Sequence, residues 1–275
     1  VIRLLMVEIS GKYKIGTRRF GLVNWIGAWT LYKKEVLRFL IVWIQTLFSP
    51  LITSLLFLSV LSLAIGNDRG NVLGVPFIVF LAPGLIAMQI IQQAFSHSSS
   101  SFMIGKIQGN IVDLLYAPLS AGEVTLAVTL ASVTRSVLIA IISLLVFYLF
   151  IDLEIKNFTT LISFTFLSAF SLGALGIIAG LWAEKFDHMA TVTNFIIIPL
   201  SFLSGTFYSI ERLPEVLQII SKANPFFYMI DGFRYSFLGQ SDGSILFGLI
   251  YLSILTLLIW FIAYILYKKG YKLKS

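Results

Sequence analysis

Six long apolar runs dominate this sequence, and each is long enough to cross a membrane as a helix. The hydrocarbon core of a bilayer is about 30 Å thick, which takes about 20 helical residues. Only the third run carries a charge, at Arg135. The sequence therefore predicts an all-α membrane protein with six transmembrane helices. These spans cover residues 39–65, 75–95, 124–151, 158–183, 191–208 and 245–267.

The composition excludes an ordinary soluble domain. Charged residues make up 12% of the chain and hydrophobic residues 58%, whereas soluble domains carry about 25% charged residues. Because the chain has no cysteine, neither a disulfide framework nor a Cys-based metal site is possible. The two histidines, His97 and His188, lie too far apart in sequence to suggest a metal site, and we predict none.

The distribution of basic residues predicts the topology. An even number of spans places both termini on one side, and 14 of the 20 Lys and Arg residues fall on that side, against five opposite. The positive-inside rule therefore predicts cytoplasmic termini. The net charge of +7 reflects this topology, and no nucleic-acid partner is expected. We expect a cytoplasmic segment (1–24), a transmembrane domain (25–267) and a basic tail (268–275).

The polar interruption "SSSSFMIGKIQGNIVDLLYAPLS" at 98–120 predicts a short helix between spans two and three, on the cytoplasmic side. Isoleucines recur at helical spacing while Lys106, Asn110 and Asp113 share another face, and Pro118 marks the end. The alternative is an interfacial helix that only joins two spans.

Two further segments predict helices at the membrane surface. Residues 25–38 alternate aromatic and basic side chains, as in an amphipathic helix on the cytoplasmic surface; an anchor that orients the first span is the plainer interpretation. Residues 203–239 are too apolar for an aqueous loop. A break at Asn224-Pro225 divides them into two short helices that dip into the outer leaflet.

Most enzyme motifs are absent. In "SSFMIGKI", Ser100 occupies the place where a phosphate-binding loop needs its first glycine, so the chain does not bind ATP by a Walker A motif. No acidic residue lies in the six spans, which weakens the case for an ion-coupled carrier. The Gly176–Gly180 GxxxG pattern favours helix packing within one subunit, with a dimer seam as the alternative.

Arg135 lies about 18 Å into its span from the cytoplasmic end, near the middle, by the helical rise. Two interpretations are open. Arg135 is either a buried structural residue satisfied by carbonyls or hydroxyls, or it lines a path and attracts an anionic substrate group.

Three sequence blocks carry a resemblance to one family. They are "VWIQTLFSPLITSLLF" (42–57), "FLAPGLIAMQ" (80–89) leading into the polar interruption, and "PLSFLSGTFYSIERLPEVLQIISKANPFFYMIDGFRYSFLG" (199–239). From about Trp25 to the tail, the chain resembles the membrane subunit of ABC-2 type transporters, particularly the bacterial drug- and polysaccharide-export branch.

The resemblance implies roles for residues of this chain. The helix after span two would be the coupling helix, its polar face toward a separate ATPase and its Ile face against the membrane domain. Its contact candidates are Gly105, Lys106, Asn110, Asp113 and Leu114. The interface helix would use Trp25, Trp29, Lys33, Lys34 and Arg38. The outer gate would use Glu211, Pro214, Asn224, Pro225 and Arg234.

The implied function is export from the cytoplasm by alternating access, in the bacterial inner membrane. Two copies of the chain would work with two ATPase subunits, which bind ATP and Mg; this chain would hold no cofactor and no catalytic residue. The substrate would be a polysaccharide, a lipid-linked molecule or an amphipathic drug. The alternatives are a nucleotide-independent channel or secondary carrier, and a membrane-embedded enzyme such as a lipid-linked transferase.

Overall fold

The computed structural model describes residues 23–69 and 71–273, most of which are helical. Within them, six helical segments are long and apolar enough to cross a membrane, which confirms the predicted six-span fold. Span 1 is η1 (Ile44–Phe48) with α3 (Ser49–Arg69), and span 5 is α8 (Phe186–Val192), η2 (Thr193–Ile197) and α9 (Ile198–Leu203). The other spans are α4 (Phe77–Ile107), α6 (Ala121–Tyr148), α7 (Phe158–Trp182) and α12 (Ile245–Lys268).

Shorter elements flank these spans. Helix α2 (Trp25–Ile41) precedes span 1, and a two-stranded hairpin of β1 (Asn71–Val72) and β2 (Val75–Pro76) connects spans 1 and 2. Helix α5 (Ile111–Tyr116) follows span 2. The turn η3 (Ile210–Arg212) and helices α10 (Glu215–Ala223) and α11 (Pro225–Leu238) lie between spans 5 and 6.

Several boundaries differ from the sequence prediction. Span 1 begins at Ile44 rather than at residue 39, because α2 continues to Ile41 and its last turn is itself apolar. Span 5 ends at Leu203, before residue 208. Helix α4 continues through the serine-rich segment to Ile107, so the predicted separate helix over 98–120 is wrong in its first half.

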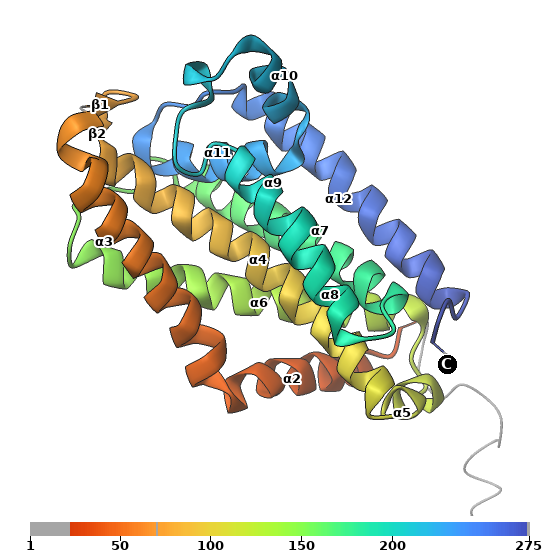
Figure 1. Ribbon diagram of the computed structural model, residues 1–275. Coiled ribbons are helices and arrows are strands. Elements are labelled where there is room, and N and C mark those ends of the chain that lie inside the picture. Colours follow the sequence, from red (N-terminus) through yellow and green to blue (C-terminus); the bar gives the residue numbers. More distant parts are fainter. Residues whose placement is uncertain (1–22, 70, 274–275) are drawn as a thin grey trace, which may run out of the picture.

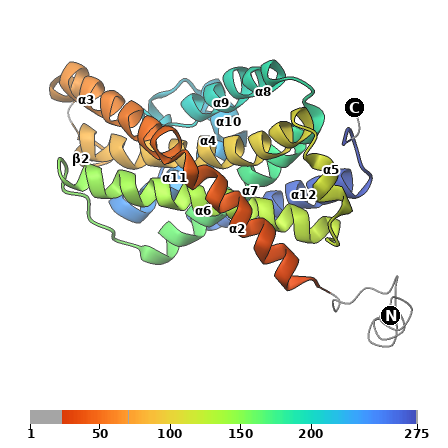
Figure 2. The ribbon, with the colours of Figure 1, turned by 90° about the horizontal axis from the view of Figure 1, so that it is seen from below.

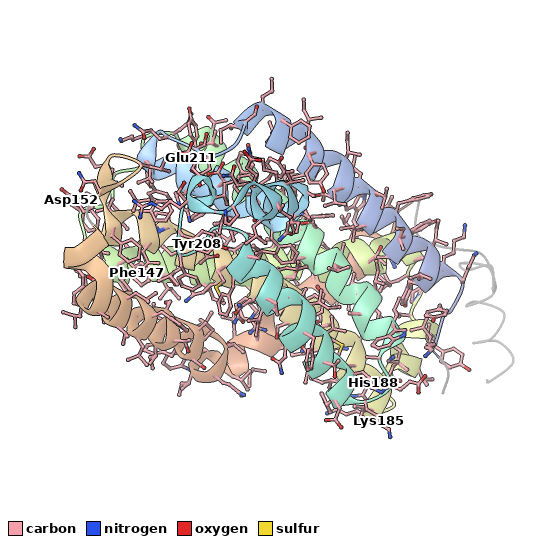
Figure 3. The ribbon with its side chains drawn as sticks, turned by 45° about the horizontal axis from the view of Figure 1, so that its top comes forward. Phe147, Asp152, Lys185, His188, Tyr208 and Glu211 are labelled. Carbon is pink, nitrogen blue, oxygen red and sulfur yellow. The ribbon has the colours of Figure 1, made fainter. Side chains whose placement is uncertain are left out.

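The bundle has two distinct ends (Figure 1). One end carries α5 and the described end of the chain near Leu273, and we call it the α5 end. The other carries the hairpin, η3 and α10, and we call it the α10 end. Figure 3 shows Lys185 and His188 at the first end and Asp152 and Glu211 at the second.

Helices α4 and α7 form the most extensive contact in the bundle. A Cβ atom added at Gly176 would lie 2.5 Å from the Phe95 carbonyl oxygen, and one at Gly180 would lie 2.8 Å from that of Ser99. Ser98 and Ser99 are buried at this seam. Small residues on both helices allow the two backbones to approach closely, which is how helices gain packing energy in lipid. The GxxxG pattern thus packs helices within this chain.

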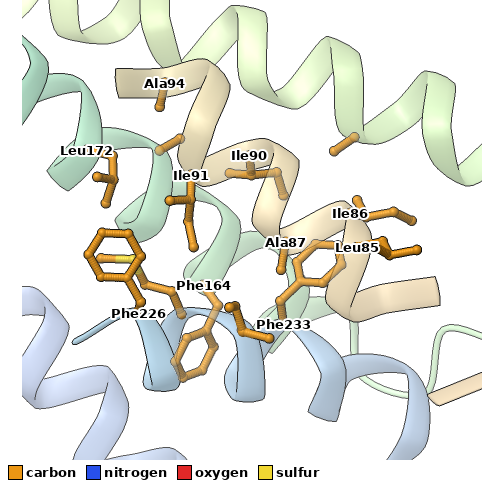
Figure 4. Close-up of a cluster of buried hydrophobic side chains, with 14 of the residues drawn as sticks. Leu85, Ile86, Ala87, Ile90, Ile91, Ala94, Phe164, Leu172, Phe226 and Phe233 are labelled. Carbon is orange, nitrogen blue, oxygen red and sulfur yellow. The ribbon is translucent and has the colours of Figure 1, made fainter. Parts of the chain in front are cut away.

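A cluster of apolar side chains fills the centre of the bundle toward the α10 end (Figure 4). Helix α11 crosses α7 there, and a Cβ at Gly232 would lie 2.2 Å from the Phe164 ring. The absence of a side chain at Gly232 therefore lets α11 lie directly on α7. Figure 4 shows Phe226 and Phe233 of α11 reaching toward Ile91 and Ala87 of α4.

Helix α2 is attached to the start of α6. Ser120 and Glu123 form a capping box at the α6 N-terminus, and Glu123 Oε1 also accepts a hydrogen bond from the Asn24 backbone N–H at 2.7 Å. From there α2 crosses the bundle (Figure 2), and the Tyr32 hydroxyl reaches the Thr134 hydroxyl at 2.7 Å. The position of α2 therefore depends on α6.

The α4–α7 seam leads to a first prediction. Gly176→Leu should lower the thermal unfolding temperature of the purified protein, because the new side chain must force α7 away from the α4 backbone; overpacking costs about 1–3 kcal/mol. Gly122→Ala is the matched control, since its Cβ would meet the Tyr264 ring at an ordinary 3.8 Å. Equal unfolding temperatures for the two variants would contradict the close packing of α7 against α4 at Gly176.

Candidate functional site

The segment that connects α4 to α5 breaks the helix at one residue. Gly109 has a φ of 75°, a left-handed conformation that glycine adopts without strain. Gly105 and Lys106 lie in the last turn of α4, Asn110 precedes α5, and α5 carries Asp113 and Leu114. The five contact candidates therefore share one end of the bundle but belong to two helices.

Lys106 binds its own chain. Its Nζ donates to the carbonyl oxygen of Leu181 at 2.9 Å and also to that of Ala183. Both carbonyls belong to the C-terminal end of α7, where a cation is favourable. Lys106 thus joins the ends of α4 and α7, whereas Asn110 and Asp113 are exposed.

The exposed face of α5 is more apolar than expected. Ile111 is buried, as the predicted Ile face requires, but Ile107 is 51% exposed. With Val112, Leu115 and Tyr116, Ile107 lines an open groove of about 1180 Å³. The groove also includes Glu184 and Lys272, which form an ion pair at 2.7 Å. The Lys272 ammonium lowers the pKa of the Glu184 carboxyl.

The residues proposed for the interface helix lie on different sides of α2. Trp25 and Trp29 are largely exposed, as are Lys33 and Lys34. Trp25 and Trp29 border an apolar cavity of about 540 Å³, whose other walls come mainly from α6. Arg38 instead turns toward α4.

A cluster of polar side chains joins α2 to α4. Arg38 pairs with Glu35 at 3.0 Å, and its Nη2 donates to the His97 carbonyl oxygen at 3.1 Å. Glu35 is 4% exposed, and its Oε2 lies 3.7 Å from Nε2 of the fully buried His97. Among the described residues, neither ring nitrogen of His97 has a hydrogen-bond partner.

Arg135 belongs to the same region of the bundle. Its Nη2 donates to Oε1 of Gln93 on α4, and its Nε has no hydrogen-bond partner among the described residues. The expected carbonyl or hydroxyl partner is thus replaced by a side-chain amide. Thr134, its neighbour, bonds Tyr32 of α2, so Arg135 lies beside the contact between α2 and α6.

At the α10 end, Asn224 and two prolines determine the helix boundaries. Pro214 precedes α10, and Pro225 is the first residue of α11. The Asn224 side chain accepts from the Phe226 N–H and donates to the Leu200 carbonyl at 3.1 Å. The helix break predicted at Asn224-Pro225 is confirmed. This residue also attaches both short helices to the end of span 5.

Arg234 is buried rather than exposed at a gate surface. Its guanidinium lies over the Phe80 ring at 3.9 Å, and its Nη2 donates to the Gly205 carbonyl at 2.6 Å. A Cβ at Gly84 would lie 2.8 Å from this nitrogen. Arg234 therefore fastens α11 to α4 and to the turn after α9, while Glu211 is exposed.

Two aspartates connect the loops of the α10 end. Asp231 accepts from the backbone N–H groups of Asp242 and Gly243 at 3.0 and 2.9 Å. Asp242 in turn accepts from the Ser209 hydroxyl at 2.6 Å and from the Ile210 N–H. Burial raises the pKa of the Asp231 carboxyl to about 6, although the two N–H groups oppose this shift.

Several of these residues were outside the sequence prediction. Glu35 and His97 come together from separate helices, and Glu184 and Lys272 are 88 positions apart, so no local pattern indicates them. The apolar residues of α5 carry a usable signal, because "IVDLLYAP" holds apolar side chains on every side of a short helix.

Comparison with known proteins agrees with this architecture. The family model described as "ABC-2 type transporter" matches residues 27–238. The inner membrane transport permease YadH of Escherichia coli K12 is 32% identical over 91% of this chain and 98% of its own length. Nodulation protein J of Neorhizobium galegae is 25% identical over 80% of this chain and 83% of its own length.

The matched region runs from α2 through the end of α11, and it includes the α4–α5 segment and the polar cluster. The family model matches most of the chain, and the relative YadH is covered almost in full, so both findings indicate the same family. This six-span chain belongs to the ABC-2 type transporter family, and it is a membrane transport permease.

Proposed function

We propose that this chain is the membrane subunit of an ATP-driven exporter, and that a separate ATPase subunit docks at its α5 end. One observation carries the proposal most directly. The exposed apolar residues of α5 are attached to the end of α4, a single helix of 31 residues. Such a helix is about 46 Å long, so it reaches from the docking surface to the opposite end of the bundle.

The groove at the α5 end suits a protein partner. Ile107, Val112, Leu115 and Tyr116 would face water in the isolated chain, and clustered apolar side chains of this kind are typical of protein contacts. Glu184 and Lys272 supply charge at the rim. A partner that moves α5 would move the end of α4 with it, because only residues 108–110 separate the two helices. ATP and Mg would be bound by that partner.

The proposal includes a second copy of the chain. Spans 1 and 5 have much more of their surface exposed than span 2. Gln45 and Ser49 of span 1 and Asn194 of span 5 are exposed, and lipid gives such groups no hydrogen-bond partner. A second copy facing these helices would cover the apolar residues and leave the polar ones along a path. A polysaccharide, a lipid-linked molecule or an amphipathic drug would use it.

The same proposal assigns the α5 end to the cytoplasm and the α10 end to the outer gate. Lys268, Lys269 and Lys272 lie toward the α5 end, in agreement with the positive-inside rule. The name of the relative YadH places that protein in the inner membrane, and we propose the same membrane for this chain.

The docking hypothesis predicts that Leu115→Asp separates the chain from its ATPase. A carboxylate in the apolar contact must be desolvated on binding, so vanadate-sensitive ATPase activity that copurifies with the tagged chain should fall at least tenfold. Ile155→Asp is the matched control, because Ile155 is also exposed outside the spans but lies at the α10 end. Undiminished ATPase in Leu115→Asp, at matched membrane levels, would show that α5 is only a connection.

The orientation is testable by cysteine labelling, since the chain has no native cysteine. Single cysteines at Glu215 and Lys222 should react with a membrane-impermeant maleimide added to intact cells. Cysteines at Asp113 and Lys272 should react only after permeabilisation. The reverse pattern would invert the topology.

Asp231 makes the stability of the proposed gate depend on pH. Its native pKa of about 6 exceeds the value of 3.8 for a free aspartate, so the native state binds the proton more tightly than the unfolded state. The wild type should therefore gain roughly 2 kcal/mol relative to Asp231→Asn as the pH falls from 7.5 to 4.5. Denaturant unfolding in detergent at several pH values measures this difference. A pH-independent difference would contradict the assignment.

A further inference from the structure

Arg135 holds a buried positive charge that no carboxylate in the described residues neutralises. It is 8% exposed, and its Nη2 donates a hydrogen bond to the neutral Gln93 amide. Its Nε has no partner among those residues. Removing a guanidinium from water costs several kcal/mol unless another charge compensates, so an uncompensated arginine at this position calls for an anion.

The charged groups around Arg135 leave an excess of positive charge. Arg38 on α2 is close enough to act on Arg135 and on His97 electrostatically. The nearby carboxylate, Glu35, is already paired with Arg38 at 3.0 Å. Helices α2 and α6 thus bring two arginines together against one glutamate.

This cluster reaches the surface of the chain. The Arg38 side chain is 29% exposed, and on α4 the exposed Ser96 lies between the half-buried Gln93 and Ser100. Ser100 Oγ lies 3.4 Å from Arg38 Nη1. One stripe of α4 therefore leads from the surface to both arginines, and Gln45 and Ser49 at the start of span 1 are also exposed.

We infer that Arg135 and Arg38 form a binding site for an anionic group, a phosphate or a carboxylate, on the transported molecule. The inference rests on the proposed export function and narrows its substrate to an anionic amphipath. An anion that replaced the Gln93 oxygen would accept from Nε and Nη2 of Arg135 together, the bidentate geometry that guanidinium offers to phosphate and carboxylate. Gln93 would hold Arg135 in place between transport cycles.

Native mass spectrometry of the purified chain, without any ATPase, tests this site. The probes are dioleoyl phosphatidylglycerol, whose headgroup has a net negative charge, and dioleoyl phosphatidylcholine, whose phosphate is neutralised by its own choline ammonium. The wild type should bind one phosphatidylglycerol about tenfold more tightly than phosphatidylcholine, the difference typical of a charge-assisted bidentate pair. Inorganic phosphate added as a competitor separates the two sources: displacement indicates recognition of a free anion, and no displacement indicates recognition of a lipid-anchored one.

Variants locate the binding within the chain. Arg135→Gln should abolish the preference for phosphatidylglycerol, while Lys269→Gln, an exposed charge beyond α12, should keep it. Gln93→Leu should strengthen phosphatidylglycerol binding several-fold, because it removes the group that competes for Arg135, and misfolding cannot produce a gain of affinity. If Arg135→Gln does not fold, Gln93→Leu decides the question.

Equal binding of the two lipids by the wild type would overturn the inference. A preference that survives in Arg135→Gln, or unchanged binding by Gln93→Leu, would also overturn it. Because the assay contains no ATPase, its failure leaves ATP-driven export in place. Loss of the docking contact in Leu115→Asp would in turn leave lipid binding unchanged.

Discussion

The close contact between α4 and α7 is the interaction on which the rest of the structure depends. Lipid provides no hydrophobic drive for two helices to associate, so they must gain van der Waals contact by approaching closely. Gly176 and Gly180 place α7 against the backbone of α4, and the small side chains of Ser98 and Ser99 fill the seam. Lys106 then closes it at the α5 end by capping α7. Helix α4 is therefore held against α7 from the seam to the α5 end.

Two groups of charged side chains contact α4 at different points along its length. Near the α5 end, Arg38 ties α2 to α4, and Arg135 ties α6 to α4. Toward the α10 end, Arg234 ties α11 to α4 through the Phe80 ring and the turn after α9. Each arginine holds one other helix, α2, α6 or α11, against α4. A displacement of α4 would therefore move the cluster around Arg38 and the α10–α11 region together.

The sequence was sufficient for the six spans, because hydropathy and length alone determine which segments suit a bilayer. It also indicated the break at Asn224-Pro225, where proline removes a donor. It did not show that Ser98–Ser101 continue α4, because a run of serines has only a weak helix propensity. The helix is favoured here by close packing against Gly176, some 78 positions away. The same limit applies to Glu35 and His97, whose contact depends on how α2 crosses the bundle, and to Gln93, which pairs with Arg135 from 42 positions away.

The central claim is that nucleotide binding moves α5 and that α4 transmits the motion as one body. Pulsed electron spin resonance on the complex with its ATPase tests this directly, with a single label at Asp113 in one preparation and at Ile78 in another. In a two-copy assembly the label at Asp113 reports the distance between copies at α5, and the label at Ile78 reports it at the opposite end of α4. The account predicts that a non-hydrolysable ATP analogue shifts both distances. A shift at Asp113 with none at Ile78, or no shift at either, would contradict it.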